Sequence, residues 1–211
     1  MITDKIMVYS EGDGIERALE EAERFAEYER LDAEEGLYLR LLSEEMLGMV
    51  RGITGGFEGK FWIQSEEGEY HICLRADTYM DRSKKKKLIA LSSGGKNESS
   101  VGIMEMIRNI VVNALNDPES VEGLQNEFDD GTVMYGNLGV REDGAINPMD
   151  FEWSLLQYKS MVEKEKKQKK AVEAWDELEK SIVANIADDV RVGVRGDIVE
   201  MTIVKKTGKA G

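Results

Sequence analysis

Two stretches of alternating apolar and polar residues, far apart in the chain, constrain the fold most. Residues 60–65 and 69–76 alternate on either side of a turn at Glu66-Glu67-Gly68. The same alternation recurs in residues 190–194 and 199–203, around Arg195-Gly196-Asp197. A period of two on both sides of a short turn is typical of a β-hairpin with one buried face. We therefore expect two hairpins that contribute antiparallel strands to a sheet.

Helical patterns precede and separate these hairpins. After a first strand at residues 5–9, apolar residues recur at helical spacing from Ile15 to Ala26. Asp32 is suited to cap a second helix that ends near Gly55, with Glu35 placed as in a capping box. A third helix is expected over residues 103–114 and one long helix over residues 151–187. This order predicts a two-layer α/β (α+β) sandwich, with a mixed or antiparallel sheet and helices on one face.

The segment between the third helix and the second hairpin sets the expected domain organisation. Residues 117–150 are rich in Gly, Asp and Asn, and we expect one short hairpin there. We interpret residues 117–187 as an insertion that includes the long helix. Residues 1–116 and 188–205 then form the domain itself, and residues 206–211 form a tail.

Charge and cysteine content limit the class of function. The net charge is −14, which disfavours binding to nucleic acid or to an anionic membrane and favours a protein partner with a basic surface. Cys73 is the single cysteine, so the chain holds no internal disulfide. No apolar run approaches the roughly 20 residues that span a bilayer, and the first residues do not resemble a secretion signal. We expect a cytoplasmic protein without a bound metal.

One segment carries a resemblance to a known family. Residues 39–50 read Leu-Arg-Leu-Leu-Ser-Glu-Glu-Met-Leu-Gly-Met-Val and resemble the N-box helix of the histidine-kinase-like (GHKL or Bergerat) ATPases. The resemblance is strongest to bacterial anti-sigma-factor serine kinases. Those proteins also have a strand, a helix and a turn like Leu31-Asp32 before this segment, and a hairpin after it. The resemblance covers residues 5–115 and resumes at 188–205. It implies the two-layer fold of that family, with an ATP cleft along residues 39–50.

The family's site residues transfer to this chain only in part. The resemblance implies that Glu45 acts as the general base. Met49 stands where the family has the Asn that holds Mg²⁺, and a thioether is a poor ligand for that cation. Asp77 matches the family's adenine-binding Asp. The glycine-containing loop before the third helix matches the phosphate-binding lid, with cofactor-binding residues Gly94, Gly95, Lys96, Asn97 and Gly102.

Two functions follow from the resemblance, and the sequence leaves both open. The first is a regulatory protein of the anti-sigma-factor kinase type that binds a sigma-factor-like or antagonist-like partner together with ATP. The second is a pseudo-ATPase without catalysis that keeps the fold for contact with another protein or with a second copy of itself. Met49 in place of the Asn weighs against phosphoryl transfer. So does the segment after Asp77, where Tyr79 and Met80 stand and the family's glycines are missing. His71, the single histidine, is interpreted as a residue of an exposed sheet face.

Overall fold

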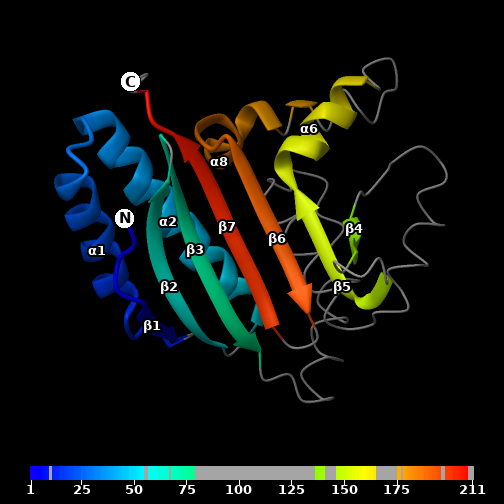
Figure 1. Cartoon of the computed structure of the whole chain (residues 1–211), viewed down its shortest axis with the longest axis horizontal. Coiled ribbons are helices and arrows are strands. Elements are labelled where there is room, and N and C mark those ends of the chain that lie inside the picture. Colours follow the sequence, from blue (N-terminus) through cyan, green and yellow to red (C-terminus); the bar gives the residue numbers. More distant parts are fainter. Residues whose placement is uncertain are drawn as a thin grey trace.

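The computed structural model describes residues 1–9, 11–54, 57–66, 68–78, 136–140, 146–164, 175–176, 178–195 and 198–208. Within these ranges a single sheet is covered by helices (Figure 1). The elements in chain order are β1 (Ile6–Tyr9), α1 (Ile15–Tyr28), α2 (Ala33–Thr54), β2 (Phe57–Glu66), β3 (Glu69–Thr78), β4 (Gly136–Val140), β5 (Ile146–Ser154), α6 (Leu155–Lys164), α8 (Ile182–Ile186), β6 (Asp189–Arg195) and β7 (Ile198–Lys206).

The sheet contains seven strands in the order β1-β2-β3-β7-β6-β5-β4. All the pairings between these strands are antiparallel. Figure 1 shows α2 behind β2, β3 and β7, and α1 beside α2, next to β1 and β2. The predicted two-layer arrangement and both predicted hairpins are therefore confirmed. The short hairpin expected within residues 117–150 is formed by β4 and β5 and continues to Ser154, and it extends the same sheet.

Alternation in the strands directs one set of side chains into the core. A row of buried residues crosses six paired strands, from β1 at one edge to β5 near the other. Its members are Ile6, Phe61, Leu74, Met201, Val192 and Trp153. A second row joins Ile63, Ile72, Ile203 and Val190. The helices pack on this face, and we call it the inner face.

The two N-terminal helices begin and pack as their sequences predict. α1 buries Ala18, Leu19, Ala22, Phe25 and Ala26. Asp32 caps α2, because its Oδ1 accepts hydrogen bonds from the backbone N–H groups of Glu34 at 3.0 Å and Glu35 at 2.9 Å. The turn before α1 depends on Gly14, whose φ is +81°. A Cβ at this residue would lie 1.9 Å from the carbonyl oxygen of Met7, so β1 and α1 can approach closely only with glycine there.

The prediction of one long helix over residues 151–187 is wrong. Residues 151–154 end strand β5, where Trp153 pairs with Val192 of β6. α6 then runs from Leu155 to Lys164, and Ser181 has an extended backbone and caps the separate helix α8. Apolar residues spaced at a helical period fit two short helices as well as one long helix. The predicted helix at residues 103–114 lies outside the described residues.

The two halves of the described chain repeat one arrangement of a strand, a helical layer and a hairpin. In the first half these are β1, α1–α2 and β2–β3, and in the second they are β5, α6–α8 and β6–β7. Equivalent hairpin positions, such as 66 and 195, are 129 residues apart. Cys73 and Thr202 are also 129 residues apart, so they occupy equivalent positions, and they pair with each other in the middle of the β3–β7 ladder. A pseudo-two-fold axis perpendicular to the sheet therefore passes through this pair.

Candidate functional site

The structure separates the site residues that the sequence predicts. Glu45 is exposed on α2, in the helical layer. Asp77 alternates with the inward-facing Ala76 on β3, so its side chain lies on the opposite face of the sheet. A shared pocket between Glu45 and Asp77 is not formed. Met49 belongs to α2, and the loop residues Gly94, Gly95, Lys96, Asn97 and Gly102 lie outside the described residues.

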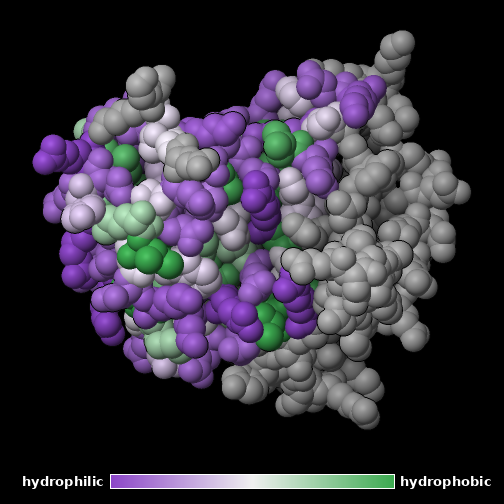
Figure 2. Space-filling view, in the orientation of Figure 1, coloured by the Kyte–Doolittle hydropathy of each residue, from purple (hydrophilic) through white to green (hydrophobic). Residues whose placement is uncertain are grey.

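The face of the sheet opposite α1 and α2 presents a different set of chemical groups. We call it the outer face, and it faces the viewer in Figures 1 and 2. The surface there is mostly hydrophilic with scattered apolar residues (Figure 2). Its central positions come from β2, β3, β7 and β6: Lys60, Trp62, Gln64, His71, Cys73, Arg75, Glu200, Thr202, Val204, Arg191 and Gly193. Cys73 and Val204 are only 5% and 3% exposed, so the centre of this face is well packed.

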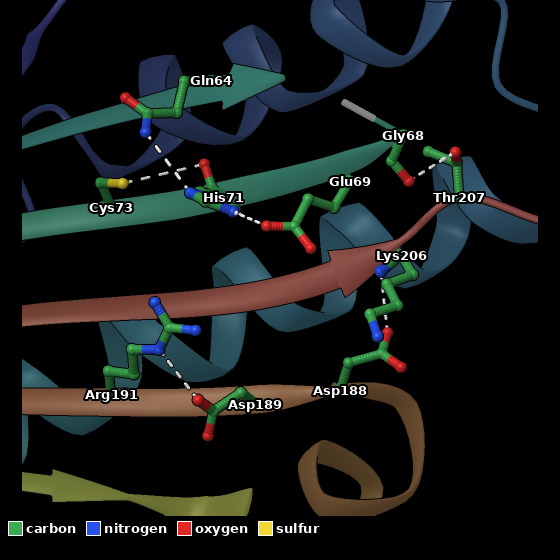
Figure 3. A network of polar contacts seen from close by, with 10 residues as sticks. All are labelled: Gln64, Gly68, Glu69, His71, Cys73, Asp188, Asp189, Arg191, Lys206 and Thr207. Atoms are coloured by element: carbon green, nitrogen blue, oxygen red, sulfur yellow. Dashed lines mark hydrogen bonds and ion pairs between the residues drawn. The ribbon is translucent and has the colours of Figure 1, made fainter. Parts of the chain in front are cut away.

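Polar contacts fix the side chains of the outer face. Arg75 Nη1 lies 3.0 Å from Glu200 Oε1, which joins β3 to β7. On β3, His71 Nε2 lies 2.7 Å from Glu69 Oε1, and its Nδ1 lies 3.4 Å from Gln64 Nε2 (Figure 3). The Arg75–Glu200 pair neutralises two charges near the middle of the face, so these two groups can meet another surface without being left as isolated charges.

An aromatic side chain lies towards the β1 side of the outer face. Trp62 of β2 is half-buried, and Lys5 Nζ lies 4.8 Å from the centroid of its ring. A lysine at this distance over an aromatic ring makes a cation–π contact, worth roughly 0.5–1 kcal/mol where both groups are exposed. Trp62 is thus held in place while part of its ring still contacts solvent.

The groups on this face do not form a nucleophilic centre. Burial raises the pKa of the Cys73 thiol to about 11, against smaller lowering effects from Thr202 and Lys5. The thiol is therefore protonated at neutral pH and is a poor nucleophile. Its Sγ donates to the backbone carbonyl of His71 at 3.8 Å, and the imidazole is engaged by Glu69 and Gln64. Cys73 is therefore a buried packing residue.

Charge is distributed unequally between the two layers. Residues 15–48, which include α1 and most of α2, hold eleven acidic and four basic side chains, a net charge of −7. The strands β2, β3, β6 and β7 together hold six acidic and six basic side chains. Half of the net charge of the whole chain therefore lies on the helical layer, and the four central strands are neutral.

The pseudo-two-fold axis shows which positions packing constrains. Most equivalent inner-face positions, such as Phe61 and Val190 or Leu74 and Ile203, are buried and apolar in both halves. Equivalent outer-face positions differ in chemistry: Trp62 corresponds to Arg191, Lys60 to Asp189, His71 to Glu200 and Arg75 to Val204. The outer face is therefore asymmetric, although the backbone beneath it is nearly symmetric. Sequence reasoning missed this surface because its residues group only once the strand order is known.

Comparisons with known proteins do not assign the chain to a class, so its class is inferred from the geometry. No family model, curated protein or solved structure matches the chain. Among the described residues, no group of three or more His, Cys, Asp or Glu side chains is placed to hold a metal ion. None of the helices in the described ranges is both long and apolar enough to cross a bilayer.

Proposed function

We propose that the protein is a non-catalytic regulatory module that binds another protein through the outer face of its sheet. The observation that carries this proposal is the chemistry of that face: a fixed, partly exposed Trp62 together with the cross-strand ion pair Arg75–Glu200. Cores of protein interfaces are depleted in uncompensated charge, and Trp and Arg dominate their energetics. Trp62 and Arg75 are the two side chains that we expect to contribute most.

The acidity of the whole chain supports a basic partner. Its net charge of −14 attracts a positively charged protein at long range and raises the association rate at low salt. The resemblance to anti-sigma-factor kinases agrees with this activity, because it implies a protein that acts through a partner. A sigma-factor-like protein or an antagonist protein is the kind of partner that the resemblance suggests.

Binding without catalysis is preferred to phosphoryl transfer because Glu45 and Asp77 lie on opposite sides of the sheet. A kinase needs its base, its metal ligands and its nucleotide together within one cleft. Nucleotide binding is checked by thermal shift with ATP and with Mg-ATP. A rise in melting temperature with either compound, lost in Glu45→Ala or Asp77→Ala, would favour the ATPase interpretation.

Site-specific photo-cross-linking in cells tests the binding surface. A photo-reactive amino acid at Arg75, which is 47% exposed on the outer face, is expected to capture a partner. The same amino acid at Glu20, exposed on α1, is the matched control and is expected to capture much less. A product of twice the mass of the chain would identify a second copy as the partner.

The variant Trp62→Ala completes this test. It is expected to abolish capture at position 75 while leaving the circular dichroism spectrum unchanged, and Tyr28→Ala on the helical layer should leave capture intact. Equal capture from positions 20 and 75, or capture that survives Trp62→Ala, would contradict the proposal.

A further inference from the structure

The last described residues cross one end of the sandwich, and three separate elements hold them. The backbone N–H of Lys206 donates to Asp188 Oδ2 at 2.7 Å. Thr207 donates its N–H and its hydroxyl to the carbonyl oxygen of Gly68, both at 2.8 Å. The N–H of Gly208 donates to Glu35 Oε1 at 2.7 Å. We call residues 206–208 the C-terminal strap, and Figure 3 shows its contacts with Gly68 and Asp188.

Tyr70 lies next to the strap. It follows the β2–β3 turn, pairs with Lys205 just before the strap, and meets the ring of Phe25 edge-on at 6.4 Å. Tyr70 is 1% exposed, and its hydroxyl has no hydrogen-bond partner in the described part of the chain. Most buried hydroxyl groups in folded proteins are paired, so an unpaired one destabilises the state that contains it.

The carboxylates that hold the strap also act on Tyr70. Burial raises the pKa of the Tyr70 hydroxyl strongly, and the charges of Glu35 and Asp188 raise it further. Asp188 is also 3.6 Å from Lys205 Nζ, whose residue is the cross-strand neighbour of Tyr70. The two carboxylate acceptors of the strap and the unpaired hydroxyl therefore lie in one neighbourhood.

We propose that the C-terminal strap is a releasable closure, because the closed state keeps the Tyr70 hydroxyl buried without a partner. In the closed state, the N–H groups of the strap bond to Asp188, Gly68 and Glu35. In the open state, these N–H groups bond to water instead, and the Tyr70 hydroxyl gains water or a carboxylate. The hydrogen bonds that the strap gains on closing are therefore offset by one unpaired hydroxyl, which favours a two-state element with a small free-energy difference. This inference does not depend on the proposed function.

Amide hydrogen exchange of the full chain tests whether the strap opens and closes in this way. Tyr70→Phe removes the hydroxyl that is unpaired in the closed state, so the closed state becomes more stable relative to the open state. The amides of Thr207 and Gly208 are then expected to exchange about fivefold more slowly, the change that one unpaired buried hydroxyl would produce. Tyr28→Phe is the matched control, because that residue is 71% exposed and its hydroxyl is in water. It is expected to leave strap exchange unchanged.

A second variant and a reference amide separate local opening from global stability. Glu35→Ala removes one acceptor and is expected to accelerate exchange at Gly208. The amide of Ala18, bonded to the carbonyl of Gly14 at 2.9 Å, reports on the start of α1, which contributes no group to the strap. Tyr70→Phe should not change its exchange rate. Unchanged strap exchange in Tyr70→Phe, or equal slowing at Thr207 and Ala18, would overturn the proposal.

Discussion

At the residue scale, Asp189 shows how one carboxylate joins three elements. Its Oδ1 accepts from Ser154 Oγ at 2.9 Å and from the N–H of Leu156 at 3.0 Å, at the start of α6. Its Oδ2 accepts from Arg191 Nε at 2.9 Å. Burial by itself raises the pKa of this carboxyl, but the three hydrogen bonds outweigh burial and the pKa lies below its ordinary value. The charged form of Asp189 therefore stabilises the folded state.

Asp189→Asn is expected to lower the free energy of unfolding by about 2 kcal/mol at pH 7, the usual range for bonds to a charged group. Because the folded-state pKa is depressed, the contribution is complete above the unfolded pKa and is lost as pH falls through the folded value. Urea unfolding at neutral and acidic pH should show the gap between the two proteins closing in acid. Asp176→Asn, at an exposed position, is the control. A gap that widened in acid would be inconsistent with this linkage.

At the element scale, two glycines should respond oppositely to alanine. Gly14→Ala places a Cβ 1.9 Å from a backbone oxygen at positive φ, and we expect a loss of about 2 kcal/mol or more. Gly48 lies in α2 with open space around its Cα, so Gly48→Ala should raise stability by about 0.5–1 kcal/mol. Chemical denaturation of both variants checks the pair. Equal effects would mean that the turn before α1 is not constrained as described.

Neighbouring residues of α2 give a second element-scale prediction. Met46 is completely buried and Glu45 is exposed. Met46→Ala should cost about 2–5 kcal/mol by leaving a cavity in the core, whereas Glu45→Ala should change stability by less than about 0.5 kcal/mol. Denaturant midpoints measure both variants. A large loss in Glu45→Ala would show that this carboxylate has a structural role that its exposure does not suggest.

Local pattern explains which elements could be predicted from the sequence. The hairpins and the helix capped by Asp32 are specified by neighbouring residues, so alternation and capping chemistry identify them. The end of β5, residues 151–154, is wrongly predicted as helix because Phe151 and Trp153 alternate over only a few residues, directly before the apolar start of α6. The pairing of β3 with β7, and therefore the outer face, depends on long-range packing that no local pattern contains.

At the scale of the whole molecule, the unequal charge of the two layers predicts a response to salt. Repulsion within the helical layer opposes folding and is screened when salt rises from about 10 mM to about 0.3 M, so the melting temperature should increase. Replacing Glu20 and Glu27 by Gln should raise the melting temperature at low salt and weaken its salt dependence. Replacing Glu58 and Glu66, which lie in the neutral strands, by Gln should change the melting temperature and its salt dependence less. An equal response from the two pairs of substitutions would contradict the unequal distribution of charge between the layers.

The pseudo-two-fold arrangement also bears on how the chain folds. Each half can form its hairpin from residues close in sequence, but the ladder between β3 and β7 unites Cys73 with Thr202, 129 positions later. Closing so long a loop is entropically costly, and contacts of this kind slow folding. We expect the two half-sheets to form early and to join late. Until they join, the edges of β3 and β7 are exposed and can pair with the wrong chain, so this junction is where misfolding would begin.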